Sequence, residues 1–406
     1  MANRRRTPRA PRITKIDFLI VGGGIGGAVL AQLLARRGKR VLVLERGLGR
    51  SGLVRPEVLW PATVQLLRSL LPGDALDDDV MIPLRGVSII RQGRTLLSIT
   101  PETLQRAGLE PMSTDPDQTR ERLLRSGGFD LERGVEATAV LKDRDRVIGV
   151  RCREIASGNE REVLAAWTVG DDGADSRVRQ GCAIELKLRP LPVDLLCFRC
   201  TWPEGLSPGK ARFWLNAGRL ASGVLGLGVI PLPGGQGAGL IPTRPRVFAD
   251  VRRAADGWRR LSASDPLIAA VMGPRRFPDD LTRVRRSWGH AQRYGCAGAV
   301  LLGDAAHPVS PAGGQGANMA VADAVALAEV ISDGGSAFLD EYERRRRPAN
   351  ERSVLITRRA ARVLSLPSLA LELVLPLALK WLDRRPERIA RGLRFVATAF
   401  LEHSRC

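Results

Sequence analysis

The sequence predicts an α/β protein with a parallel-sheet domain at the N-terminus, an inserted mixed β-sheet domain and a helical C-terminus. Between residues 15 and 45, two short apolar runs flank a glycine cluster and a stretch of good helix formers. Strand-like runs broken by Gly and Pro dominate 80–115 and 185–285, and helical patterns fill most of the chain after 336.

The chain length and charge narrow the class of protein. A chain of 406 residues exceeds one ordinary core, so more than one domain is expected. Only six of the 63 basic residues are lysines, and the arginines that give most of the net charge of +20 are spread along the chain. Aromatic residues are only 4%, so we predict no nucleic-acid partner. A basic surface would still attract anionic ligands or membranes.

The expected domains are discontinuous. Residues 1–14 are assigned to a disordered basic tail, because the apolar stretch that follows is too short for a signal peptide, and we therefore expect a cytoplasmic protein. The parallel-sheet domain is expected to comprise 15–80, 116–184 and 286–345. The mixed-sheet domain would comprise 81–115 and 185–285, and the C-terminal helical region 346–406.

The six cysteines show no disulfide framework. Cys197 and Cys200 form a C-x-x-C pair, but the run 194–202 is strand-like and does not open a helix, as a redox pair usually would. We interpret them as buried thiols, with redox or metal use as the alternative. No metal site is predicted.

A strand–turn–helix–strand unit opens the ordered chain. Lys15–Val21 and Arg40–Glu45 are the expected strands, and 28–37 the helix between them. In the turn, Gly22 permits the tight bend, Gly24 lets the backbone approach a pyrophosphate, and Gly27 allows close packing of helix and strand. The helix N-terminus offers free N–H groups to the phosphates.

Glu45 completes this Rossmann-type unit. It lies 21 residues after Gly24, at the end of the second strand, where a carboxylate can accept the hydroxyls of an adenosine ribose. An acid at this position argues against a 2′-phosphate. The unit therefore predicts an adenine dinucleotide site and leaves the choice between NAD and FAD to motifs elsewhere.

Three segments elsewhere in the chain distinguish between NAD and FAD. Gly303–Asn318 resembles the pattern G-D-A-A-H-x-x-x-P-x-x-G-Q-G-x-N, Asp171–Arg179 resembles D-G-x-x-S-x-x-R, and Tyr342–Pro348 resembles Y-E-x-x-R-x-P. These patterns, in this order, are those of the class A flavoprotein monooxygenases, the para-hydroxybenzoate hydroxylase and ubiquinone-biosynthesis hydroxylase group. The resemblance spans most of residues 15–350.

The resemblance implies a function. Class A enzymes hold FAD, take electrons from NADPH or NADH without a second dinucleotide domain, and react with O2 to give a flavin C4a-hydroperoxide. The expected reaction is hydroxylation or epoxidation of a hydrophobic or aromatic small molecule. The alternatives are an FAD-dependent reductase or epoxidase of an isoprenoid-like substrate and a non-catalytic flavin sensor. Such sites often lack an essential acid or base, so no catalytic residue is predicted.

The resemblance also assigns cofactor residues. Asp304 would bond the ribityl chain, Asp172 would support the pyrophosphate region, and the first amides of the helix opened by Gly316 would face the flavin O2. The complete predicted set is Gly22, Gly24, Gly27, Glu45, Arg46, Arg55, Arg120, Asp172, Asp304, Gly316, Ala317 and Asn318. For Arg55 and Arg120 the alternative is a solvated surface arginine. His307 is interpreted as a structural residue.

The C-terminal region contains the apolar stretch Leu364–Leu382, which is interrupted by Pro367, Glu372 and Pro376 and followed by several arginines. A helical cap with an apolar face is the first interpretation. Peripheral contact with a membrane is the second, and a spanning helix is not expected. The oligomeric state is left open.

Overall fold

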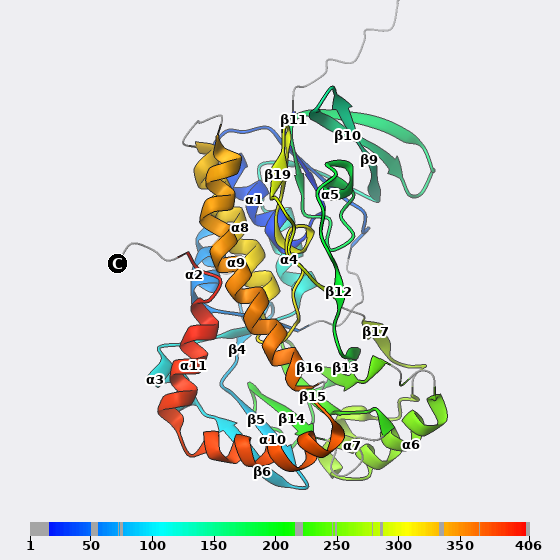
Figure 1. Ribbon diagram of the computed structural model, residues 1–406, viewed down its shortest axis with the longest axis vertical. Helices are drawn as coiled ribbons and strands as arrows, with labels where there is room; N and C mark the ends of the chain where they lie inside the picture. Colours follow the sequence, from blue (N-terminus) through cyan, green and yellow to red (C-terminus); the bar gives the residue numbers. More distant parts are fainter. Residues whose placement is uncertain are drawn as a thin grey trace, which may run out of the picture.

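The computed structural model describes residues 16–49, 56–71, 73, 76–215, 222–245, 247, 250–277, 279–284, 287–332, 337–364 and 366–402 (Figure 1). The predicted tail 1–14 and Arg55 lie outside these residues. The predicted α/β class, with its mixed second sheet and helical C-terminus, is confirmed.

An eight-stranded sheet forms the upper part of the molecule in Figure 1. Its central strands are parallel, in the order β20 (Ala299–Leu301), β11 (Glu160–Gly170), β1 (Ile16–Val21), β2 (Val41–Glu45) and β8 (Asp130–Arg133). Antiparallel β19 (Gly295–Cys296) pairs with β20, while β9 (Val135–Asp143) and β10 (Arg146–Glu154) form a meander with β11. The inner strands are buried on both faces, which explains their unbroken apolar runs.

Helices cover this sheet. Helix α1 (Ile25–Ala35) packs against α8 (Gln315–Ser332), and the approach is close because a Cβ at Gly26 would lie 3.1 Å from the carbonyl oxygen of Ala320. Helices α2 (Pro61–Leu70) and α4 (Pro116–Arg125) also contact α1, and α5 (Arg177–Gly181) lies against β9 and β11. Helix α9 (Phe338–Val363) packs on α8.

One helix is shorter than its sequence pattern predicts. The stretch 56–72 reads as helical, but Glu57–Leu59 forms strand β3, and α2 begins only at Pro61. The cause is tertiary: β3 pairs with β7 (Met112–Thr114), which also pairs with β4 (Met81–Pro83). Proline at the first helical position then fixes the start of α2.

A seven-stranded mixed sheet forms the lower part of the molecule in Figure 1. Helices α6 (Val251–Ser262) and α7 (Pro266–Met272) cover one face and share a core with it. Its strand order is β17 (Thr282–Val284), β13 (Asp194–Thr201), β16 (Gln236–Thr243), β15 (Gly226–Leu232), β14 (Lys210–Leu215), β5 (Gly86–Arg91) and β6 (Arg94–Ile99). A short pair, β12 (Arg189–Pro190) and β18 (Ser287–Trp288), lies between the two sheets.

The C-terminal helices connect the two parts. Helix α10 (Ser368–Asp383) contacts β6 along the lower edge of the molecule, and α11 (Pro386–Thr398) returns past α3 (Pro101–Ala107) (Figure 1). Leu371 on the inner side of α10 packs with Val193 and Leu225. Within the described ranges, no helix has both the length and the hydropathy needed to span a bilayer.

Candidate cofactor site

The predicted motifs meet at one edge of the parallel sheet. Strands β2, β1, β11 and β20 are neighbours and run in the same direction, so their carboxyl ends lie side by side. These ends carry Glu45, the loop 22–27, Asp171 and Gly303. Segments up to about 280 residues apart in sequence therefore share the edge where α/β sheets bind ligands.

The glycine loop is shaped by close backbone contacts. Gly22 has a φ of +100°, and a Cβ there would lie 2.3 Å from the carbonyl oxygen of Asp171. A Cβ at Gly27 would lie 2.6 Å from the carbonyl oxygen of Gly22, and one at Gly24 would lie 2.4 Å from Oδ2 of Asp171. These three positions accept glycine alone without displacement of a neighbour.

Glu45 is held against this loop by two backbone amides. The N–H of Gly23 donates to Oε2 over 2.7 Å, and the N–H of Gly47 donates to Oε1 over 2.6 Å. The carboxylate is half-buried, and these two hydrogen bonds fix its orientation. Arg46 points elsewhere: its side chain is 74% exposed, and its Nη1 lies 3.8 Å from Oε1 of Glu136 on β9.

Asp171 is a site residue that sequence reasoning missed. From the sequence we assigned its neighbour Asp172, yet Asp171 accepts a 2.8 Å hydrogen bond from the N–H of Gly27 in the first turn of α1. A Cβ at Gly303 would lie 3.1 Å from its Oδ1, so this carboxyl joins two motifs. Burial raises the pKa of Asp171 well above its usual range, and the acids Asp172, Asp304 and Glu45 add to the increase.

Asp172 supports the site indirectly. Its Oδ2 accepts from the amides of Arg177 and Val178 and so caps helix α5, and burial raises its pKa. From the same helix, the buried guanidinium of Arg179 donates to the carbonyl oxygens of Ala174 and Ala305 over 2.7 and 2.9 Å. Arg179 thereby links the segment after β11 to the segment after β20.

The segment 303–318 brings a second helix N-terminus to the site. Asp304 is half-buried in a single 3₁₀ turn, Gly303–Ala305, and Gly316 and Ala317 lie in the first turn of α8. The side chain of Asn318 is buried, accepts from the N–H of Trp60 over 2.9 Å and donates to the carbonyl oxygen of Val58 over 2.9 Å. It thus ties the start of α8 to the strand β3.

A buried acid positions this segment from behind. Oδ2 of Asp323 on α8 accepts from the N–H of Gly303 over 3.0 Å and from Nε2 of His307 over 2.6 Å. Its Oδ1 accepts from Nε of Arg346 over 2.8 Å. Burial opposes ionisation here, but His307 and Arg346 outweigh it and lower the pKa of Asp323 far below its usual range. His307 is fully buried in this cluster, in keeping with a structural role.

Arg120 holds the loop after Glu45. Its guanidinium is mostly buried, donates to the carbonyl oxygen of Gly49 over 2.9 Å, and lies 3.6 Å from Asp117 and 3.7 Å from Glu121. Helix α4 ends at Arg125, five residues later, as the glycines at 127 and 128 predict.

This arrangement fits an adenine dinucleotide with a flavin. The glycine loop and the first turn of α1 form a cradle that Cβ atoms would fill, which suits a pyrophosphate. Glu45 suits a ribose, Asp304 offers a carboxylate for a polyol chain, and the first turn of α8 presents amides to a ring carbonyl. Asp171 adds an acid whose raised pKa reduces its charge beside this cradle.

Curated proteins of known activity resemble the chain along most of its length. A family model described as an FAD binding domain matches residues 15–357. A 6-methylpretetramide 4-monooxygenase of Streptomyces rimosus is 28% identical over 416 residues, which cover 95% of this chain and 70% of that protein. A 4-methyl-5-nitrocatechol 5-monooxygenase of a Burkholderia species is 29% identical over 388 residues, which cover 86% of this chain and 67% of that protein.

Solved structures show the same fold. The p-nitrophenol 4-monooxygenase PnpA of Pseudomonas putida superposes with a TM-score of 0.78 at 21% identity, over 96% of this chain and 99% of that one. PqsL of Pseudomonas aeruginosa, a probable FAD-dependent monooxygenase, superposes with a TM-score of 0.71 at 24% identity, over 91% of this chain and 100% of that one. This chain therefore belongs to the FAD-binding-domain family of class A flavoprotein monooxygenases and is an FAD-dependent enzyme of that family.

Proposed function

We propose that this chain uses NADPH or NADH and O2 to hydroxylate or epoxidise a hydrophobic or aromatic small molecule. The observation that carries the proposal is the convergence of Glu45, the glycine loop, Asp171 and the 303–318 segment on one sheet edge. Relatives that match most of the chain are named as monooxygenases of ring compounds, which supports the reaction class but not a particular substrate.

Each side chain has a task in this proposal. FAD, when bound, supplies the redox chemistry that transfers electrons from NAD(P)H to O2. The glycine loop and the start of α1 would hold its pyrophosphate, and Glu45 its ribose. Amides at the start of α8, including that of Ala317, would stabilise negative charge on the ring system. Arg120 would act by fixing the loop 47–49.

The mixed sheet supports an apolar substrate. Phe213 pairs with Ile89 on one side and with Gly228 on the other, where its ring covers the glycine. These residues alternate with members of the α6–α7 core, such as Trp214 and Ile90, so they belong to the opposite face. That face is half-buried and carries aliphatic and aromatic groups.

The test is coupled turnover by the purified yellow protein. We expect a hydrophobic phenol or polyaromatic substrate to stimulate consumption of NAD(P)H and O2 together, with one oxygen atom from ¹⁸O2 in the product. If such a substrate stimulated the oxidation of NAD(P)H without uptake of O2, the enzyme would be a reductase instead. Absence of turnover with every donor and ring compound would contradict the proposal and favour a flavin sensor.

We expect Asp171 to make FAD binding dependent on pH. Its pKa is raised in the folded protein, and the negatively charged pyrophosphate beside it would raise that pKa further, so the neutral acid favours binding and the affinity should fall as the pH rises through the value of the free protein. We expect the FAD dissociation constant of the apoprotein to rise above that pH by up to about tenfold per pH unit. Asp171→Asn should flatten this rise, as measured by flavin fluorescence quenching.

Asp175→Asn is the matched control, because this neighbouring acid is exposed. It makes the same change from acid to amide and should leave the pH profile unchanged. If Asp171→Asn retained the wild-type slope, the titrating group would be another acid.

We also propose that the protein is cytoplasmic and touches an anionic membrane surface through α10. On its outer side α10 exposes Leu369, Leu373, Val374, Leu377 and Trp381, and Leu366, just before the helix, extends this apolar stripe. Arg385 and Arg388 lie 4.0 and 4.8 Å from the Trp381 ring, at the end of this stripe. Apolar side chains beside arginines suit a layer of anionic lipid headgroups, whereas a second copy of a chain with net charge +20 would be repelled.

Vesicle sedimentation tests this membrane contact. We expect the protein to sediment with phosphatidylglycerol-containing vesicles and not with neutral ones, and Leu373→Glu with Leu377→Glu to reduce the bound fraction by about tenfold or more. The control pair, Ile155→Glu with Leu164→Glu, replaces two exposed apolar residues, one in the turn after β10 and one on β11, and should bind as wild type does. Equal binding to neutral vesicles, or equal loss in both pairs, would contradict the proposal.

A further inference from the structure

Two cysteines far apart in sequence meet beside the cofactor-binding sheet. Cys182 follows helix α5 directly, and Cys296 lies on β19. Their Sγ atoms are 2.8 Å apart although 114 residues separate them. Both are free thiols, and a disulfide bond of about 2.0 Å would require only a small movement of the side chains.

The two thiols differ in reactivity. Contact with the Cys182 thiol lowers the pKa of Cys296, and Lys142 and Arg293 lower it further, against the opposing effect of burial. Cys182 is buried, and its pKa is raised by the contact with Cys296 and by burial. Because the thiolate is the reactive form, Cys296 is the expected nucleophile and Cys182 its resolving partner.

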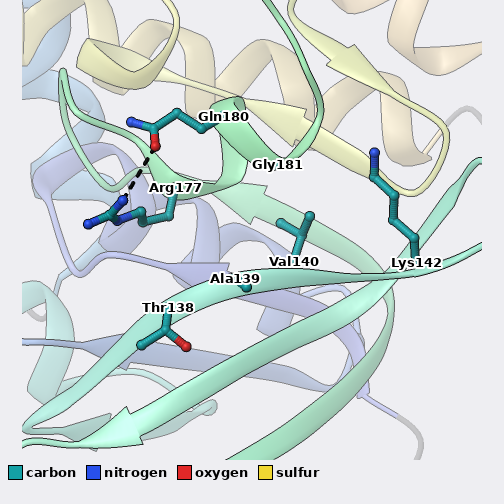
Figure 2. Close-up of a pocket in the computed structure, with 7 residues that line it drawn as sticks. All are labelled: Thr138, Ala139, Val140, Lys142, Arg177, Gln180 and Gly181. Carbon is teal, nitrogen blue, oxygen red and sulfur yellow. Dashed lines mark hydrogen bonds between the residues drawn. The ribbon is translucent and has the colours of Figure 1, made fainter.

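A pocket between β9 and α5 adjoins the chain next to Cys182. Figure 2 shows its lining, in which Gly181 precedes Cys182 and Lys142 comes from the facing strand; the others are Thr138, Ala139, Val140, Arg177 and Gln180. Cys296 itself is partly exposed. A small reagent can therefore approach this pair without unfolding of the sheet.

We propose that Cys182 and Cys296 are a redox modification site that closes reversibly to a disulfide. With hydrogen peroxide as oxidant, the Cys296 sulfur attacks one peroxide oxygen, the O–O bond breaks and the first water leaves, giving a sulfenic acid. The Cys182 sulfur then attacks that sulfur, forms the S–S bond and releases the second water. The two thiols lose two electrons, and the peroxide is reduced to two waters.

The bond would join two cofactor segments. Helix α5 is capped by Asp172 and begins just after the end of β11, while β19 leads into β20 and Gly303. A cross-link between them would restrict opening of the sheet edge described above. We therefore expect the oxidised protein to unfold at a higher temperature than the reduced one.

The C-x-x-C pair provides an internal contrast. Cys197 and Cys200 are three residues apart on strand β13, so they point to opposite faces of the sheet. Both are buried, and burial raises the pKa of Cys200. Cys197 and Cys200, which form the C-x-x-C motif, are therefore not placed to pair with each other. Cys182 and Cys296, which are, belong to no sequence motif.

Peptide mapping of the flavin-loaded protein tests the proposal. A Cys406→Ser background leaves five thiols and excludes the cysteine at the end of the chain. We expect stoichiometric hydrogen peroxide to remove two of the five thiols, to yield a peptide that links residues 182 and 296, and to be reversed by dithiothreitol. The Cys296→Ser variant should lose none of its remaining thiols at that rate, whereas the control Cys200→Ser should still lose two thiols.

The linked peptide decides the outcome even if a variant folds poorly, because it is measured without substitution at either partner. Absence of the 182–296 peptide, with thiols lost elsewhere or retained, would overturn the proposal. So would loss of two thiols from a folded Cys296→Ser protein at the parental rate.

Discussion

Replacing Arg346 with alanine is expected to lower the free energy of unfolding by about 3–5 kcal/mol, the usual cost of leaving a buried charge without its partner. The guanidinium is fully buried and donates to Asp323 over 2.8 Å, to the carbonyl oxygen of Phe400 over 2.9 Å and to Asn350 over 3.0 Å. Without this guanidinium, only His307 would remain to compensate the buried negative charge of Asp323, the carboxylate that also holds Gly303. Urea unfolding followed by tryptophan fluorescence measures the loss.

Arg344→Ala is the matched control, two residues away on the same helix. Its side chain is 72% exposed and pairs with Glu341 at the surface, so its loss should cost less than about 1 kcal/mol. Equal losses in both variants would show that helix α9 responds to any loss of arginine, and would contradict a specific role of the buried pair.

The cost of Arg346→Ala should also depend on pH. The pKa of Asp323 is lowered in the folded protein, so its stabilising contribution is present above the ordinary carboxyl pKa of about 3.9 and is lost as the pH falls through the lowered value. The difference between wild type and Arg346→Ala should therefore be full at pH 7 and shrink in strong acid. A difference that grew on acidification would place the interaction at another residue.

The parts of the site that could be predicted from the sequence are those encoded locally. Gly22, Gly24, Gly27 and Glu45 form one strand–turn–helix–strand unit, and their contacts follow from its geometry. The segment 303–318 likewise follows a short buried strand and opens a helix. In both cases a run of neighbouring residues determines the backbone, and the backbone determines what each residue can do.

The parts that were missed depend on which segments the sheet brings together. Asp171 contacts Gly27, 144 residues earlier, whereas the D-G pattern of the local sequence selects its neighbour Asp172. For Asn318 the sequence predicts only a backbone amide toward the flavin, and its buried side chain ties α8 to Val58 and Trp60, about 260 residues earlier. The pattern of 56–72 predicts helix where strand β3 forms, because the partner strand β7 lies more than 50 residues away. Each contact depends on the order of strands, which local periodicity does not encode.

Gly22→Ala is expected to yield folded but flavin-poor protein. Any L side chain at a φ of +100° is strained by about 1–3 kcal/mol, and the new Cβ would also lie 2.3 Å from the carbonyl oxygen of Asp171. The three atoms nearest to this Cβ all belong to the backbone of Asp171 and Asp172, so the contact can be relieved only by moving the glycine loop away from the end of β11. We expect the FAD dissociation constant to rise by at least about tenfold, or ~1.4 kcal/mol.

Gly38→Ala separates the two causes of this loss. Gly38 follows the end of α1 with a φ of +72°, yet a Cβ there would meet nothing within 4 Å. This variant should lose about 1 kcal/mol of stability from backbone strain alone and bind FAD as wild type does. Thermal unfolding and flavin titration of both proteins give the comparison. If Gly38→Ala lost flavin as readily as Gly22→Ala, weakened binding would follow from general destabilisation of α1. If only Gly22→Ala did, the close approach of Gly22 to Asp171 is what shapes the pyrophosphate cradle.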